Sequence, residues 1–354
     1  MEEIKSLIAS IQPLNYKAMA TTLKRLDDLT KPVGSLGGLE KMACQLAGIR
    51  GTFPPALPRK ALVLMAADHG VTAEGVAASP PAVTEQMIYN FIGGGAAINV
   101  LSRHANADLI VVDVGVKCDF PPDLPIMHCK IRRGTDNMRQ KAAMSRTDAI
   151  AAIKVGITMV ETLASQGYAV IGLGEMGIGN TTASSAIASV LTGKPVSEVV
   201  GKGGGIPSER VSHKVQVVEE AIAHNKPNPQ DAIDVLAKVG GLEIAAMAGV
   251  VLAAAANRIM LVIDGFISSS AVLAAYKLSN RIKPYLLATH LSEEPGHQAI
   301  LDIVGLTPFL QLNMCLGEGT GGVLGMTVLD AAVKILHEMA TFEEAKVFPV
   351  KSNL

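Results

Sequence analysis

Short runs of wholly apolar residues recur along the chain, and segments long enough for a helix separate them. Runs of this length that are apolar on both faces indicate buried parallel strands joined by crossover helices. The pattern therefore predicts an α/β fold with a parallel sheet and helices on both faces. The predicted strands cover residues 61–66, 109–112, 169–173, 259–263 and 286–288.

Helical patterns occupy both ends of the chain. Residues 2–29 have a helical pattern that Pro13 interrupts, residues 31–38 form a glycine-rich loop, and residues 39–49 form a short amphipathic helix. Near the C-terminus, residues 325–341 carry apolar side chains at helical spacing, and a polar tail begins at Glu343. The most apolar stretch, 244–263, contains Asn257 and Arg258, so we expect a buried helix that continues into a strand and not a membrane span.

Each predicted strand ends in a chemically useful group. The residues that follow the runs are Asp68-His69-Gly70, Asp113, Gly174-Glu175, Asp264 and His290. In open parallel sheets the ligand lies outside the carboxyl ends of the strands. Acids and glycines also end strands that bind nothing, so one instance would carry little weight; the repetition favours an enzyme.

Composition narrows the class of protein. Lys and Arg total 31 against 32 Asp and Glu, and there is no tryptophan, which argues against a nucleic-acid partner. The four cysteines are scattered without a Cys-x-x-Cys pair, and the N-terminus has no signal peptide, so we expect a cytoplasmic protein with reduced thiols. The histidines are equally scattered; Asp68-His69 has no second ligand cluster, and we expect no metal and no cofactor.

A lone acid in a glycine-rich loop is the leading candidate for a catalytic group. Glu318 lies in the sequence Leu316-Gly-Glu-Gly-Thr-Gly-Gly322, between an apolar run and a helical segment. A carboxylate in this setting is easily desolvated, which raises its pKa toward the range of a general base. The alternative is a surface acid in an ordinary turn before a helix.

The segment Gly172-Leu-Gly-Glu-Met-Gly-Ile-Gly-Asn-Thr-Thr182 matches the dinucleotide pattern Gly-x-Gly-x-x-Gly. We expect Asn180 or Thr181 to cap the helix that follows, whose N-terminus would suit an anion. Glu175 beside that anion fits a ribose hydroxyl or a cationic ring better than a pyrophosphate. An NAD-dependent oxidoreductase is the alternative, but no acid ends a strand about 20 residues later, as the full pattern requires.

A second glycine-rich loop, Val200-Gly-Lys-Gly-Gly-Gly-Ile206, precedes Lys214. Its exposed backbone N–H groups can form an anion-binding nest, to which Lys214 would add a positive charge. It lacks the Gly-Lys-Ser/Thr of a P-loop. The alternative is a flexible surface loop.

Six segments in the same order resemble the nicotinate-nucleotide–dimethylbenzimidazole phosphoribosyltransferase family of cobalamin nucleotide-loop assembly. They are Leu29-Thr-Lys-Pro-Val-Gly-Ser-Leu-Gly-Gly-Leu39, Ala67-Asp-His-Gly70, Gly174-Glu-Met-Gly-Ile-Gly-Asn-Thr-Thr182, Asp231-Ala-Ile-Asp-Val-Leu236 with Lys238-Val-Gly-Gly241, Asp264-Gly-Phe266 and Leu316-Gly-Glu-Gly-Thr-Gly321.

The resemblance implies a Rossmann-like α/β domain at residues 61–322 and a small helical domain built from residues 1–60 and 323–354, in a homodimer. It implies that nicotinate mononucleotide and 5,6-dimethylbenzimidazole, or a related base, give α-ribazole 5′-phosphate and nicotinate with inversion. Glu318 would be the catalytic base, and Glu175 would stabilise positive charge at the ribose C1′. The implied substrate-binding residues are Ser79, Gln86, Met87, Gly177, Asn180, Thr181, Gly203, Gly204, Gly205, Lys214, Ser292 and Leu316.

One position departs from the family pattern. Some members of the family place a glutamine in the base pocket where this chain has Met87, with Gln86 beside it. The identity of the base therefore stays open among benzimidazoles, purines and phenols. A nucleotide-binding regulator, in which Glu318 does no chemistry, is the non-enzymatic alternative.

Overall fold

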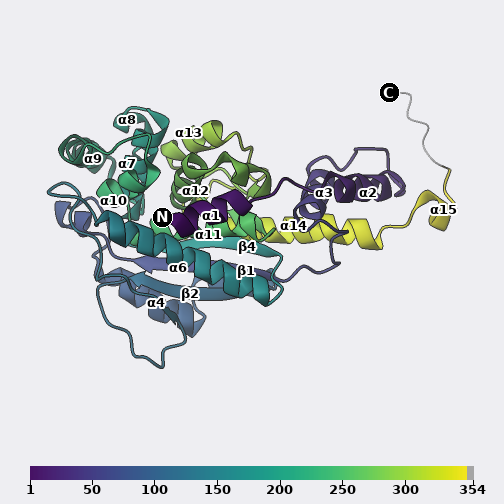
Figure 1. Cartoon of the computed structure of the whole chain (residues 1–354), viewed down its shortest axis with the longest axis horizontal. Coiled ribbons are helices and arrows are strands. Elements are labelled where there is room, and N and C mark those ends of the chain that lie inside the picture. Colours follow the sequence, from purple (N-terminus) through teal and green to yellow (C-terminus); the bar gives the residue numbers. More distant parts are fainter. Residues whose placement is uncertain (349–354) are drawn as a thin grey trace.

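A six-stranded parallel sheet lies at the centre of the computed structural model, which describes residues 1–348 (Figure 1). Its order is β3-β2-β1-β4-β5-β6, the doubly wound order of dinucleotide-binding sheets. The strands are β1 Lys60–Ala67, β2 Asp108–Gly115, β3 Met127–His128, β4 Val170–Met176, β5 Met260–Ile263 and β6 Leu286–Ala288. The predicted α/β fold and its five strands are confirmed. Strand β3 was missed because it has two residues, both exposed, and hence no apolar run.

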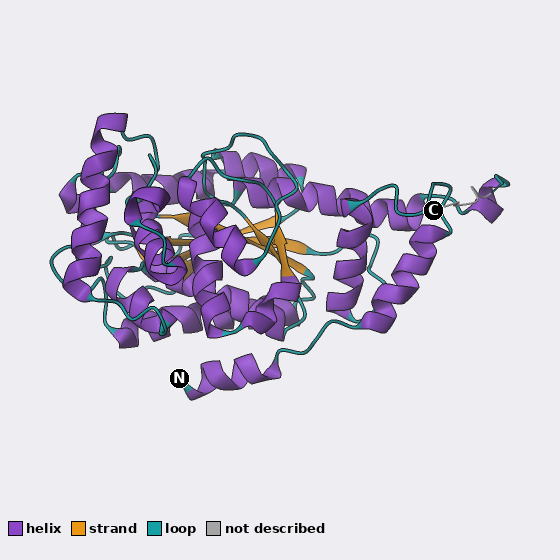
Figure 2. Cartoon of the chain, turned by 90° about the horizontal axis from the view of Figure 1, so that it is seen from above, coloured by secondary structure: helices purple, strands orange, loops and turns teal. Residues whose placement is uncertain are grey.

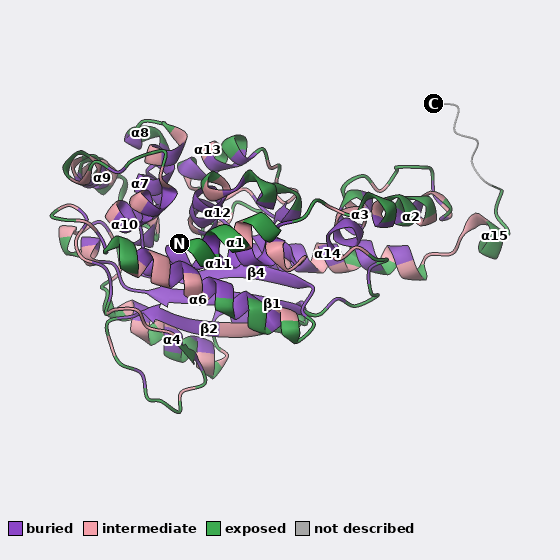
Figure 3. Ribbon diagram, viewed as in Figure 1, coloured by how far each residue is buried: buried purple, intermediate pink, exposed green. Residues whose placement is uncertain are grey.

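β1 lies in the middle of the sheet, and its residues suit that position: seven of the eight are apolar, and the eighth, Lys60, forms an ion pair with Asp330. Each of the eight is buried, and the strand pairs in parallel with β2 on one side and β4 on the other. The buried strands stand out in Figure 3. The chain winds outward from β1 in one direction and from β4 in the other. The switch point between β1 and β4 is where such sheets bind ligands.

Helices enclose the sheet on both faces, as Figure 2 shows. α11 packs against β1, β2, β4 and β5 and also against α6, whereas α14 packs against β4 and β5 beside α5. The helices are α1 Glu2–Ser10, α2 Tyr16–Asp27, α3 Gly38–Arg50, α4 Ala82–Gly93, α5 Ala97–His104, α6 Arg146–Ser165, α7 Asn180–Thr192, α8 Val196–Val199, α9 Val211–Asn225, α10 Ala232–Val239, α11 Leu242–Ala256, α12 Phe266–Leu278, α13 Pro295–Val304, α14 Thr320–Glu338 and α15 Phe342–Ala345. Three 3₁₀ turns complete them: Gly70–Glu74, Ser208–Arg210 and Asn280–Tyr285.

A helical arm extends from this body and joins the two ends of the chain (Figure 1). α2, α3 and the C-terminal part of α14 pack together there. They have their own apolar cluster, Leu26, Leu29, Ala43 and Leu336. The strand-like contact between Leu29 and Thr341 ties the two ends. The division at residues 60 and 323 stays a prediction: α1 packs on α11 of the main body, and α14 runs without a break across residue 323.

Most of the helices follow the sequence pattern. The N-terminal helix breaks between Ser10 and Tyr16, around Pro13, and the apolar stretch 244–263 is helix α11 followed by β5. None of the described helices is both long and apolar enough to cross a membrane. The C-terminal helix starts at Thr320 instead of Gly325, so its first turn directly follows Glu318. Residues 349–354 of the predicted polar tail lie outside the described residues.

Candidate active site

A cavity of about 270 Å³ lies at the carboxyl end of the sheet, beside the switch point. The loops after β4, β5 and β6, the glycine-rich loop at 203–204, helix α4 and the loop before α14 all contribute to it. Its lining comprises Val83, Met87, Glu175, Met176, Gly177, Ile178, Asn180, Thr181, Gly203, Gly204, Asp264, Gly265, Phe266, Ile267, Ser268, Ser292, Glu294, Cys315, Leu316, Gly317 and Glu318.

Glu318 has an unusual backbone conformation just before the start of α14. Its φ is +64°, in the left-handed region that residues other than glycine rarely adopt. The residue is only 9% exposed, and among the described residues its Oε2 has no hydrogen-bond partner. Burial raises the pKa of this carboxyl, while the backbone amide of Ile98 at the start of α5 offsets part of the effect. A carboxylate with few partners and a raised pKa suits a general base.

Glu175 lies at the end of β4, directly behind Glu318. Its Oε1 accepts a hydrogen bond from the Glu318 backbone N–H at 3.2 Å, and its Oε2 accepts one from the Asn180 side chain. Complete burial raises the pKa of Glu175 to about 8, and the nearby charge of Asp264 adds to this. The carboxyl of Glu175 thus holds the backbone of Glu318, a residue from a distant part of the sequence, at the end of the sheet.

The prediction that Asn180 or Thr181 caps α7 is wrong. The helix begins at Asn180, its N-cap is Gly179 with φ +96°, and no side chain caps it. The Asn180 amide donates to Glu175 instead, and the Thr181 hydroxyl accepts a hydrogen bond from Lys214. Both side chains are therefore used by the site and not by the helix terminus.

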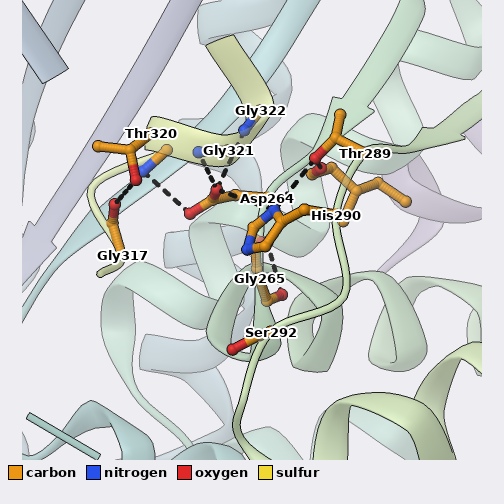
Figure 4. A network of polar contacts seen from close by, with 12 residues as sticks. Asp264, Gly265, Thr289, His290, Ser292, Gly317, Thr320, Gly321 and Gly322 are labelled. Atoms are coloured by element: carbon orange, nitrogen blue, oxygen red, sulfur yellow. Dashed lines mark hydrogen bonds and ion pairs between the residues drawn. The ribbon is translucent and has the colours of Figure 1, made fainter. Parts of the chain in front are cut away.

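Asp264, at the end of β5, fixes the loop that carries Glu318 (Figure 4). Its Oδ1 accepts hydrogen bonds from the backbone N–H groups of Gly321 and Gly322, at 2.8 and 3.0 Å. Its Oδ2 accepts one from Gly319, at 3.1 Å. Burial raises the pKa of Asp264 to about 7, and these backbone donors pull it back down. A strand-end acid that the sequence marked as part of the site thus acts as the cap of α14.

Two buried histidines support the loop after β6. The Nδ1 atom of His297 accepts from the backbone N–H of Ser292 at 3.0 Å, so its Nε2 carries the proton and donates to Ser269 at 2.9 Å. Burial lowers the pKa of His297 to about 3, which keeps it neutral. His290 packs against Gly321, where a Cβ atom would collide with its ring, and lies next to Asp264 (Figure 4). These contacts place Ser292 on the cavity wall.

The structure brings most of the predicted residues together at one cavity. Those on its wall are Glu318, Glu175, Met87, Gly177, Asn180, Thr181, Gly203, Gly204, Ser292 and Leu316. Lys214 is fully buried behind Thr181, while Gln86 is exposed on α4; neither Ser79 nor Gly205 belongs to the lining. Sequence reasoning missed Val83, Phe266 and Glu294. Glu294 could have been found, because Pro295 marks the start of α13 in the segment that follows β6.

The Gly-x-Gly-x-x-Gly match has a packing role in this fold. Gly172 and Gly174 lie inside β4, whereas the dinucleotide pattern places its glycines in the turn after the strand. A Cβ atom on Gly174 would approach the Glu318 carbonyl oxygen to 2.6 Å. This glycine therefore lets the Glu318 loop rest on the sheet, and the support for an NAD-dependent oxidoreductase is lost.

His69 has a structural partner in place of a metal. Its Nε2 lies 2.6 Å from Glu243 Oε1, and both side chains are buried. Within residues 1–348, no three His, Cys, Asp or Glu side chains come together as a metal site would require. The pair instead joins the loop after β1 to the start of α11.

The raised pKa of Glu175 predicts a pH dependence of stability. Its pKa rises from 4.5 to about 8 on burial, so folding takes up a proton between these values. Stability that is fully present below pH 4.5 is then lost as the pH rises toward 8. We expect the melting temperature to fall by about 2 °C or more across this range. The Glu175→Gln variant should lose much of this slope, measured by thermal unfolding at several pH values; an equal slope in both proteins would assign the dependence to other groups.

The fold is a doubly wound sheet, with carboxylates near its switch point and a glycine-rich loop beside them. These features define an α/β enzyme that acts on a nucleotide. A family model described as phosphoribosyltransferase matches residues 11–347. The chain belongs to the nicotinate-nucleotide–dimethylbenzimidazole phosphoribosyltransferase family, as its relatives show.

A protein of this name from Geotalea uraniireducens is 50% identical over 347 residues, which cover 98% of this chain and 99% of the relative. The protein of the same name from Roseiflexus sp. is 49% identical, with 98% of each chain covered. A crystal structure of CobT from Thermus thermophilus superimposes with a TM-score of 0.89 at 43% identity, over 94% of this chain and 100% of that one. The family resemblance inferred from the six segments is confirmed.

Proposed function

We propose that this chain transfers the phosphoribosyl group of nicotinate mononucleotide to 5,6-dimethylbenzimidazole or a related base. The products are nicotinate and α-ribazole 5′-phosphate, for cobalamin nucleotide-loop assembly. The observation that carries the proposal is the buried Glu318, with its raised pKa, on the wall of the cavity. The names of the full-length relatives support the same reaction.

Glu318 takes the proton from one imidazole nitrogen of the base while the other nitrogen attacks C1′ of the ribose. Attack from the face opposite nicotinate inverts C1′, so a β-nucleotide gives an α-nucleotide. The electrons of the breaking bond return to the pyridinium, which leaves as a neutral ring. The protein then has to position two substrates and move one proton.

Glu175 acts on the sugar side of the reaction. Without ligand its raised pKa keeps it protonated at neutral pH, which avoids a repulsion with Asp264. A bound pyridinium brings a positive charge to the cavity and favours the ionised form. The ionised carboxylate then stabilises positive charge that develops at C1′.

An apolar wall receives the base. It comprises Val83, Met87, Met176, Ile178 and Leu316. Apolar side chains offer no hydrogen bonds to exocyclic amines or carbonyls, which favours methylated benzimidazoles over purines. Gly203, Gly204, Thr181 and Ser292, with Lys214 behind them, hold the 5′-phosphate on the opposite side. The proposed substrate-binding set is completed by Ser79, Gln86, Gly177, Asn180 and Gly205. The enzyme acts as a homodimer in the cytoplasm.

Product analysis tests the reaction directly. Nicotinate mononucleotide is incubated with 5,6-dimethylbenzimidazole, adenine or a phenol, and the products are identified by chromatography and by NMR of the anomeric proton. We expect an α-linked product and release of nicotinate, with 5,6-dimethylbenzimidazole preferred. A β-linked product would overturn the inversion, and no product with any base would overturn the function.

The same assay in EDTA tests the absence of a metal requirement. The pyridinium leaving group departs without Lewis-acid help, so we expect the same rate with and without chelator. The control is a parallel assay in which excess magnesium is restored. A rate that falls in EDTA and recovers with magnesium would show that the reaction needs a divalent ion.

A further inference from the structure

A carboxylate already occupies the glycine-rich loop of the cavity. The Gly203 backbone N–H donates to Oε1 of Glu294 at 2.8 Å. Glu294 comes from the N-cap of α13, far along the chain, and lies on the cavity wall with Gly203, Thr181 and Ser292. Its other oxygen, Oε2, is buried and accepts no hydrogen bond from the described residues. The anion-binding loop is therefore filled by a group of the protein itself.

The cation behind this loop has no paired anion among the described residues. Lys214 is fully buried, and its ammonium donates to Thr181 Oγ1 at 2.8 Å and to the Gly201 carbonyl at 3.4 Å. Burial lowers its pKa to about 8, and the negative charge of Glu294 offsets part of that effect. Glu294 thus supplies a nearby negative charge to a buried lysine, without forming an ion pair with it.

The local backbone is shaped around this carboxylate. A Cβ atom on Gly201 would collide with Oε2 of Glu294 and with the ring of Pro295, so glycine is required while the carboxylate is in this place. The Ser292 hydroxyl accepts a hydrogen bond from the backbone N–H of Glu294 at 3.3 Å and fixes the base of the side chain. The carboxylate itself can swing away by rotation of its side-chain torsions while the backbone stays in place.

We propose that Glu294 is an internal anion that holds the phosphate cradle while the nucleotide is absent and withdraws from Gly203 when the 5′-phosphate binds. The inference rests on the proposed function, because it needs a phosphate-bearing substrate at this loop. In the empty site a resident carboxylate accepts the Gly203 amide and supplies a nearby negative charge to Lys214. Since it must be displaced, it weakens phosphate binding and helps the phosphorylated product to leave.

The Glu294→Gln variant tests this role because glutamine keeps the size of the side chain and removes its charge. Binding of inorganic phosphate, nicotinate mononucleotide and the dephosphorylated riboside is measured by calorimetry below pH 8, where Lys214 is charged. We expect phosphate and the mononucleotide to bind roughly tenfold more tightly. The riboside should bind with unchanged affinity, and the KM for the mononucleotide should fall more than kcat changes.

Glu293→Gln is the matched control, because Glu293 is the exposed neighbour of Glu294 and lies outside the cavity lining. This variant should bind all three ligands as the parent does. Equal or weaker phosphate binding in a folded Glu294→Gln variant would overturn the displacement role; weaker riboside binding would assign Glu294 to the ribose. If no protein turned over the mononucleotide, the proposed function would fail, yet phosphate binding would still decide the role of Glu294.

Discussion

Replacing Glu318 with glutamine is expected to lower kcat/KM by roughly 10²- to 10⁴-fold, the range that a positioned general base contributes. Glutamine keeps the shape of the side chain but cannot take the imidazole proton. The loss should fall on kcat, because the phosphate cradle and the base wall are untouched. Steady-state kinetics with both substrates, together with calorimetric binding of nicotinate mononucleotide, measure the two effects separately.

Glu338→Gln provides the control, since Glu338 is exposed at the far end of the same helix, α14. It should retain parental kinetics and unfold at the parental temperature. Normal turnover in Glu318→Gln would remove this residue from the chemistry. Loss of nucleotide binding with unchanged kcat would make it a binding residue only.

The position of the site could be predicted from the sequence because strand ends in a parallel sheet converge. Asp264, Glu175 and the His290 loop follow apolar runs far apart in the sequence, yet they meet at one edge of the sheet. The period of the apolar residues determines which segments are strands, and the fold brings the ends of those strands together. Glu318 was a candidate for a different reason: the glycines around it leave few groups to pair with its carboxylate.

The partners of these side chains could not be predicted in the same way. Asparagine is a residue type that often caps helices, but the side-chain amide of Asn180 donates a hydrogen bond to the buried Glu175 instead. Glu294 fills the glycine loop from a segment 91 residues away, and no local pattern encodes such a contact. Local patterns predict where the backbone turns, whereas hydrogen bonds between distant segments are decided by burial, which the sequence does not display.

Replacing Asp264 with asparagine should damage both stability and catalysis. The aspartate accepts three backbone N–H groups from the first turn of α14, two at Oδ1 and one at Oδ2. Asparagine has a single acceptor oxygen, so its amide group must face at least one of these donors. A buried donor left unpaired costs about 1–3 kcal/mol of unfolding free energy. Burial raises the pKa of Asp264 from 3.8 to about 7, so the parent protein loses stability as the pH rises through this range, whereas asparagine does not titrate; the difference between parent and variant should therefore be largest below pH 4 and shrink toward pH 7.

The catalytic effect of Asp264→Asn comes from the position of Glu318, which directly precedes Gly319. If the Gly319 amide is released, the left-handed backbone at Glu318 loses one of its two ties, the other being the contact with Glu175. A misplacement of about 1 Å can cost on the order of 10²-fold in rate. We therefore expect a fall of that order in kcat with little change in KM, measured beside unfolding by denaturant.

Asp231→Asn separates capping from positioning, because Asp231 caps α10 and lies outside the cavity lining. Its Oδ1 accepts from the backbone N–H groups of Ile233 and Asp234. Asparagine caps a helix about as well as aspartate, so this variant should lose only the half-exposed ion pair with Arg146, at most about 1 kcal/mol of stability, and keep its kcat. If Asp264→Asn behaved in the same way, its carboxylate would be only a helix cap. A loss of kcat confined to Asp264→Asn would show that Asp264 holds Glu318 in place for the proton transfer, since Asp231 caps its own helix without contacting this loop.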